Sequence, residues 1–111
     1  MEEGFWIQVL QKQLNDNEIL CEYLTKCGIK LYLFGSARIS KTPNDLDILL
    51  IYPDNTRVTK VLELKKELIS YLYGLNGIKM HMVLMTVQEN EEINFLKKES
   101  AVKLYISRKS K

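Results

Sequence analysis

The chain has 111 residues, of which 46% are hydrophobic and 27% are charged. This size and composition predict one globular domain over residues 1–111, with a modest core and no room for a second domain. The 16 Lys and Arg residues exceed the 14 Asp and Glu residues by a net charge of +2. From charge alone, so small an excess does not indicate binding to nucleic acid or to a membrane.

Two further patterns bear on the compartment in which the protein acts. The N-terminus alternates apolar and polar positions, unlike the basic and then apolar plan of a signal peptide. No apolar run reaches the roughly 18 residues that a membrane span requires. Cys21 and Cys27 follow a helical pattern without a CxxC or Cys/His cluster, so both are expected to be reduced packing residues. We therefore expect a cytoplasmic protein.

The N-terminal part, residues 1–28, is predicted to form two helices. Its apolar residues follow helical spacing better than alternation. Asn15 or Asp16 is expected to cap the second helix, and Gly28 is expected to stop it in a left-handed conformation.

The central part, about residues 30–85, alternates strands with a helix. Short apolar runs bounded by turn residues predict strands, and apolar positions three and four apart predict a helix. The predicted elements are a strand over 30–34, a strand over 45–52, an amphipathic helix over 56–73 that Gly74 and Gly77 end, and a strand over 78–86.

The C-terminal part, residues 86–111, begins with Thr86 followed three positions later by Glu89, which predicts a capping box for a helix over about 87–99. A short strand is expected in the tail. The alternation of strands and helices predicts an α/β (α+β) fold, in which helices pack on a small mixed β-sheet.

Two carboxylates stand at the beginning of the strand over 45–52. Residues two apart in a strand point to the same face, so Asp45 and Asp47 are expected to project together. Adjacent like charges disfavour each other's ionised form unless a cation or water screens them. The pair is therefore either a solvated strand end or a metal site, and oxygen ligands at this spacing suit Mg²⁺.

The preceding strand ends in Gly35-Ser36. A glycine at this point allows close approach of a ligand to the backbone, and the following N–H groups with the Ser36 hydroxyl can donate to a phosphate. Arg38 can add a charge-assisted contact. Taken singly, Ser36 can merely cap a turn, and Arg38 and Lys41 are read as solvated loop charges. Together with the two carboxylates, these residues predict a site for a metal-bound nucleoside triphosphate.

The stretch FGSARISKTPNDLDILL resembles the signature of the DNA polymerase beta-like nucleotidyltransferase superfamily, and is most similar to its smallest members, the minimal nucleotidyltransferases. The resemblance extends over residues 30–85 and implies a nucleotidyltransferase-like fold. It implies that Gly35 and Ser36 bind the triphosphate, expected to be ATP, and that Asp45 and Asp47 bind Mg²⁺ or Mn²⁺.

Two features depart from this family pattern. The connector between Ser36 and Asp45 lacks the glycine that often follows the arginine, which leaves the role of Arg38 open. The family usually has a third carboxylate on the later strand, and His81 occupies the matching position. Histidine prefers softer cations than Mg²⁺, although it can act as a general base near neutral pH. By itself, His81 is read equally well as a packed or half-exposed strand residue without a catalytic role.

The short chain leaves little room for an acceptor-binding domain. By resemblance, the acceptor is expected on a helical protein partner of the HEPN type, in a toxin–antitoxin pair, and self-association is the competing solution. Two functions stay open. The first is an enzyme that transfers a nucleoside monophosphate to an acceptor hydroxyl, with Asp45, Asp47 and His81 as the catalytic residues. The second is a catalytically degenerate module that binds a partner or senses a nucleotide.

Overall fold

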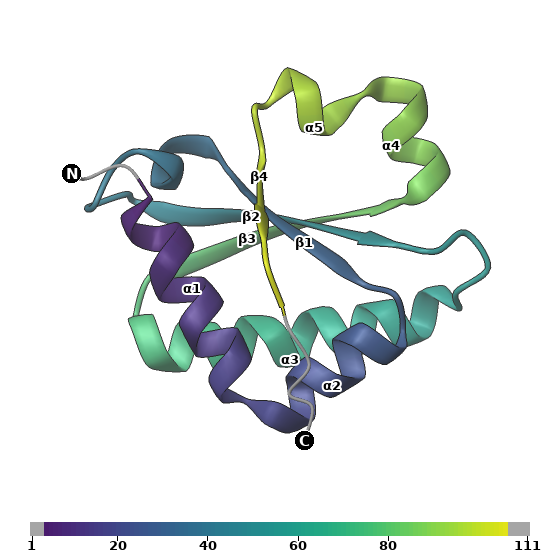
Figure 1. Cartoon of the computed structure of the whole chain (residues 1–111), viewed down its shortest axis with the longest axis horizontal. Coiled ribbons are helices and arrows are strands. Elements are labelled where there is room, and N and C mark those ends of the chain that lie inside the picture. Colours follow the sequence, from purple (N-terminus) through teal and green to yellow (C-terminus); the bar gives the residue numbers. More distant parts are fainter. Residues whose placement is uncertain (1–3, 107–111) are drawn as a thin grey trace.

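The computed structural model describes residues 4–106 (Figure 1). The elements in chain order are α1 (Phe5–Asp16), α2 (Glu18–Lys26), β1 (Lys30–Phe34), the 3-10 helix η1 (Gly35–Arg38), β2 (Asp45–Tyr52), α3 (Val58–Asn76), β3 (Lys79–Thr86), α4 (Val87–Ile93), α5 (Phe95–Lys98) and β4 (Val102–Leu104). All four predicted strands are therefore present.

The strands form one mixed sheet in the order β3-β2-β1-β4. Strand β1 pairs antiparallel with β2 and with β4, whereas β2 pairs parallel with β3. A parallel pair requires a crossover connection, and α3 supplies it between β2 and β3. The predicted mixed sheet with helices packed on it is confirmed.

The hydrophobic core lies between one face of the sheet and helices α1, α2 and α3. Alternate strand residues such as Leu31, Ile48 and Met82 join one buried cluster with Leu10 of α1 and Leu68 of α3. Figure 1 shows α1, α2 and α3 on one side of the strands, with α4 and α5 on the other. We call the second face of the sheet the open face, because within residues 4–106 only the short helices α4 and α5 lie over it (Figure 1).

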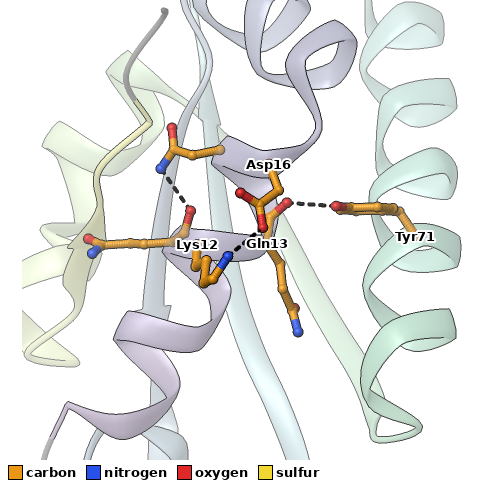
Figure 2. A network of polar contacts seen from close by, with 6 residues as sticks. Lys12, Gln13, Asp16 and Tyr71 are labelled. Carbon is orange, nitrogen blue, oxygen red and sulfur yellow. Dashed lines mark hydrogen bonds and ion pairs between the residues drawn. The ribbon is translucent and has the colours of Figure 1, made fainter.

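Helix α1 is tied to α3 by polar contacts (Figure 2). The Tyr71 hydroxyl donates to the Gln13 carbonyl at 2.6 Å. The side-chain amides of Gln13 and Asn76 exchange two hydrogen bonds, each 2.9 Å long. On the exposed side of the helix, Lys12 and Asp16 form an ion pair at 2.8 Å. The polar contacts to α3 hold the C-terminal half of α1 in place in addition to the packing of its apolar face.

The predicted cap of the second helix is wrong by one or two residues. Helix α1 continues through Asn15 and Asp16, and Asn17 is the N-cap of α2, with its side chain accepting from the Leu20 N–H at 3.1 Å. The reason is that Asn17 adopts the extended conformation that an N-cap needs. The predicted left-handed Gly28 is confirmed by its φ of 72°.

Two other predicted helix ends are also corrected. Helix α3 passes through Gly74 and ends only at Gly77, which has a φ of 66°, because the added turn lets Asn76 reach Gln13. The single helix predicted over 87–99 is divided into α4 and α5 at Asn94, whose φ of 56° is left-handed. Asn tolerates this conformation better than most residues, so the break falls there.

The predicted capping box is confirmed at the start of α4. Thr86 Oγ1 accepts from the Glu89 N–H at 3.0 Å, and Glu89 Oε1 accepts from the Thr86 N–H at 2.9 Å. We expect Thr86→Ala to lower the free energy of unfolding by about 1 kcal/mol, measured by urea denaturation. Thr59→Ala, at an exposed position inside α3, is the control and should change stability little. An equal effect of both substitutions would contradict a capping role for Thr86.

No helix within residues 4–106 is both long enough and apolar enough to cross a membrane.

Candidate functional site

Both predicted carboxylates lie on the open face of the sheet. Strand β2 begins at Asp45, and Asp45 and Asp47 are half-buried, whereas Leu46 and Ile48 between and after them point into the core. The apolar run that follows buries both faces of β2, which anchors the strand. The sheet therefore presents two carboxylates side by side at the start of a strand that cannot easily shift.

Gly35 lies directly against Asp47. Phe34 is the register partner of Asp47 across β1 and β2, and Gly35 continues the chain with a φ of +78°. A Cβ atom built on Gly35 would overlap Oδ2 of Asp47 and lie 3.1 Å from its Cγ. The missing side chain thus makes room for the carboxylate, which brings the predicted phosphate-binding turn and a predicted metal ligand into contact.

Residues 35–38 form the short helical turn η1 that the phosphate-binding interpretation requires. The Ser36 side chain is exposed, and its backbone carbonyl accepts from the N–H groups of Ile39 and Ser40. Arg38 is half-buried rather than fully solvated, and its Nε atom is buried without a hydrogen-bond partner among residues 4–106. Lys41 is exposed, as expected for a loop charge, with its Nζ 5.2 Å from the centre of the Phe5 ring.

His81 lies opposite Asp47 on the neighbouring strand. The two residues are register partners in the parallel β2–β3 pair, and Nδ1 of His81 lies 3.2 Å from Oδ1 of Asp47. The His81 side chain is 64% exposed and that of Asp47 is 20% exposed. The histidine is therefore a solvent-facing neighbour of the carboxylate; of the packed or half-exposed strand residue that was the alternative, the packed form is excluded.

Lys79 is a residue of this site that the sequence interpretation missed. It is the register partner of Asp45, so it extends from the same face of the sheet. It is exposed and forms no ion pair with any carboxylate among residues 4–106. The alternation of Lys79 and His81 along β3 was a usable signal, because residues two apart in a strand share a face. Which residues of β2 face Lys79 and His81, however, depends on the register of the parallel β2–β3 pair.

The open face also holds an apolar cluster beside the carboxylates. Leu49 and Ile51 are buried although they alternate with the core-facing residues of β2. The Phe34 ring packs edge to face on the Phe95 ring of α5, with 5.1 Å between centroids. Helix α5 thus covers the sheet immediately next to Asp47, which limits the site on that side.

A groove of about 680 Å³ lies elsewhere, between α2 and α3, where Ile19, Tyr23 and Glu63 are among its lining residues. Both helices pack on the face of the sheet opposite the carboxylates. This groove is therefore separate from the candidate site.

The resemblance to nucleotidyltransferases implies a small mixed sheet in which a Gly-Ser turn follows one strand and two carboxylates begin the next, and the structure has this geometry. The nucleotidyltransferase domain family matches residues 17–108. Because this match covers most of the chain, the protein belongs to that family. Searches of curated proteins and of solved structures found no match. The predicted family is confirmed, and a nucleotide is the substrate that the family implies.

The residues of the site fit a divalent metal that a nucleotide helps to hold. Within residues 4–106, no three His, Cys, Asp or Glu side chains are grouped so that they could bind a metal ion together. Mg²⁺ usually takes only one or two protein carboxylates and completes its coordination with phosphates and water. Asp45 and Asp47 are two such carboxylates, and the Asp47 carboxylate occupies the space that a side chain at Gly35 would fill.

Proposed function

We propose that the whole chain, residues 1–111, acts as one Mg²⁺-dependent nucleotidyltransferase domain of the minimal type. It moves a nucleoside monophosphate from a nucleoside triphosphate, with ATP as the expected donor, to an acceptor hydroxyl. Asp45 and Asp47 hold the metal, while Gly35 and Ser36 hold the β- and γ-phosphates. The observation that best supports the proposal is the close packing of the Asp47 carboxylate against Gly35.

The reaction forms a bond between the acceptor oxygen and the α-phosphorus and breaks the bond from that phosphorus to the pyrophosphate. A bound metal supplies neutralisation of the triphosphate charge. The protein residues contribute chiefly by position. The N–H groups of η1 and the Ser36 hydroxyl bind phosphate oxygens, and Arg38 adds a charged donor. Asp47 lies between Gly35 and His81, and these two contacts keep its carboxylate at a fixed position relative to the Gly-Ser turn.

His81 has a geometry that supports a role as general base. When Nδ1–H donates to Oδ1 of Asp47, Nε2 carries a free lone pair, because a neutral imidazole has one donor and one acceptor nitrogen. The exposed ring can then accept the proton of an acceptor hydroxyl.

The acceptor in this proposal is a protein side-chain hydroxyl. A second protein presents this hydroxyl to the site in the proposed arrangement. A helical partner of the HEPN type, with this chain as the antitoxin, is one such arrangement, and a second copy of this chain is the other. A cytoplasmic location belongs to the same proposal, since nucleoside triphosphates and reduced cysteines are found there.

The first experiment supplies both substrates at once. The protein is incubated with ATP labelled at the α-phosphate, Mg²⁺ or Mn²⁺, and lysate of its source cells. We expect a labelled protein band that requires the metal, and its mass identifies the acceptor. ATP labelled at the γ-phosphate is the control, because nucleotidyl transfer releases that label with pyrophosphate. Labelling from the γ-position without labelling from the α-position would instead indicate phosphoryl transfer.

A second candidate function is favoured by the two residues of β3 that face the carboxylates. Lys79 faces Asp45 and His81 faces Asp47, so β3 contributes no third carboxylate there. Such a site can bind a metal–nucleotide complex while transfer is slow. The alternative is therefore a degenerate nucleotidyltransferase that senses a nucleotide or binds a partner. Metal-dependent ATP binding without any labelled acceptor would favour it.

Substitution of His81 separates these two functions. We expect His81→Asp to raise metal-dependent transfer by roughly tenfold, about 1.4 kcal/mol of barrier, because it places a carboxylate opposite Asp47. Initial rates of label transfer at fixed Mg²⁺ measure the effect. His81→Asn is the matched control, with a similar side chain but no charge. If His81→Asp and His81→Asn both transferred at the rate of the unchanged protein, this position would have no part in the protein's chemistry, whereas an equal loss in both would support His81 itself as the base.

A further inference from the structure

The first turn of α1 contacts the connector, residues 37–44, that joins the Gly-Ser turn to Asp45. The Gly4 N–H donates to the Arg38 carbonyl at 3.3 Å. The indole Nε1–H of Trp6 donates to the Lys41 carbonyl at 2.9 Å, across 35 positions of sequence. The start of α1 is thus bonded both to the end of η1 and to the middle of the connector.

Trp6 is itself held firmly. Its side chain is only 7% exposed and belongs to the hydrophobic core. Its ring also packs edge to face on Phe5, with 5.3 Å between centroids, and the Lys41 ammonium lies over that same Phe5 ring. The donor that reaches Lys41 is therefore attached to the core and not to a mobile surface side chain.

The other end of α1 is anchored separately. The Tyr71 hydroxyl of α3 donates to the Gln13 carbonyl (Figure 2), and α3 packs against the sheet in the same core. Helix α1 is consequently fixed at both ends, to α3 at one and to the connector at the other.

Ala37 anchors the start of the connector in the hydrophobic core, but residues 39–44 have few other contacts that hold their shape. The N–H groups of Ile39 and Ser40 bond back to Ser36, and the Thr42 N–H bonds to the Ser40 side chain. These contacts are local to the loop and do not fix it against the sheet. An unrestrained loop of this length has many conformations, and ordering it when ligand binds weakens affinity.

We propose that Trp6 is a positioning residue for the nucleotide site, which orders the connector through its bond to Lys41. The connector begins beside Ser36 and ends at Asp45, so an ordered connector adds to the pairing of β1 with β2 in holding the phosphate donors and the first carboxylate in place. Helix α1 is then part of the nucleotide-binding apparatus through the contacts of its first turn with η1 and the connector. This inference rests on the proposed nucleotide binding.

The test removes only the indole donor. Trp6 is the single tryptophan of the chain, so its replacement by benzothienylalanine, which keeps the ring shape and lacks the N–H, alters this position alone. Trp6→Phe is the second variant. Tyr71→Phe is the matched control, because it removes one hydrogen bond from a side chain to a backbone carbonyl at the opposite end of α1. The two readouts are amide hydrogen exchange over 39–44 and the dissociation constant of Mg²⁺–ATP.

We expect faster exchange over 39–44 and about fivefold weaker Mg²⁺–ATP binding, close to 1 kcal/mol, for both Trp6 replacements. Tyr71→Phe should leave both readouts unchanged, because the two hydrogen bonds between Gln13 and Asn76 still hold that end of α1. Unchanged exchange over 39–44 in the benzothienylalanine protein would overturn the inference without touching the proposed function. Unchanged affinity despite faster exchange would also overturn it. Failure of the unmodified protein to bind Mg²⁺–ATP would instead refute the proposed function, and with it the role of Trp6 there.

Discussion

Replacing Asp45 and Asp47 together by Asn is expected to lower nucleotidyl transfer by more than about 100-fold and to remove metal-dependent ATP binding. Removal of a single preorganised electrostatic contact in an enzyme site commonly costs this much, and here both proposed metal ligands lose their charge. Transfer of the α-label measures the first effect. Mn²⁺ titration in the presence of a non-hydrolysable ATP analogue, followed by electron paramagnetic resonance, measures the second.

The loss must come from the site and not from unfolding. Both carboxylates are only half-buried, and their like charges repel, so the amides should leave the thermal midpoint nearly unchanged or slightly raised. Glu63→Gln with Glu67→Gln is the matched control, since it neutralises two carboxylates on α3, across the sheet from the site. If the double Asn protein kept metal-dependent transfer, the assignment of Asp45 and Asp47 would be wrong.

The sheet could be predicted from the sequence because its strands are short apolar runs with sharp ends. Residues 30–34 and 45–52 match β1 and β2 as the structure has them. The common face of Asp45 and Asp47 followed from the two-residue period of a strand alone. The helix ends were less predictable, because they depend on contacts made far away in sequence. Helix α3 continues past Gly74 to a hydrogen bond with Gln13, 63 positions distant.

The contacts between the residues of the candidate site could not be predicted from the sequence and are seen only in the three-dimensional structure. His81 faces Asp47 only because α3 brings β3 alongside β2 in one particular register. The same register places Lys79 opposite Asp45. The bond from Trp6 to the Lys41 carbonyl has no sequence signature at all, since the acceptor is a backbone atom that any residue carries. Local patterns thus identified the chemical groups, whereas tertiary packing decided which groups meet.

Gly35→Ala is the other substitution with a large expected effect, and we expect it to impair both stability and transfer. An alanine in the left-handed region costs about 1–2 kcal/mol, and the φ at this position is +78°. The new Cβ would in addition overlap the Asp47 carboxylate, so either the strand end or the carboxylate must move. A misplacement of about 1 Å in a catalytic site can cost roughly 100-fold in rate.

The control Gly77→Ala separates the effect of backbone strain from the effect of overlap with Asp47. Gly77 also has a positive φ, of +66°, but a Cβ there would meet no atom within 4 Å. The Gly77→Ala protein should therefore be destabilised only by the left-handed backbone conformation of the new alanine, and it should keep full transfer and ATP binding. Urea denaturation gives the two stabilities, and label transfer well below both unfolding midpoints gives the two rates. If Gly35→Ala behaved like Gly77→Ala in both measurements, the contact between the Gly-Ser turn and Asp47 would carry no function. A selective loss of transfer in Gly35→Ala would tie the turn and the carboxylate into one site.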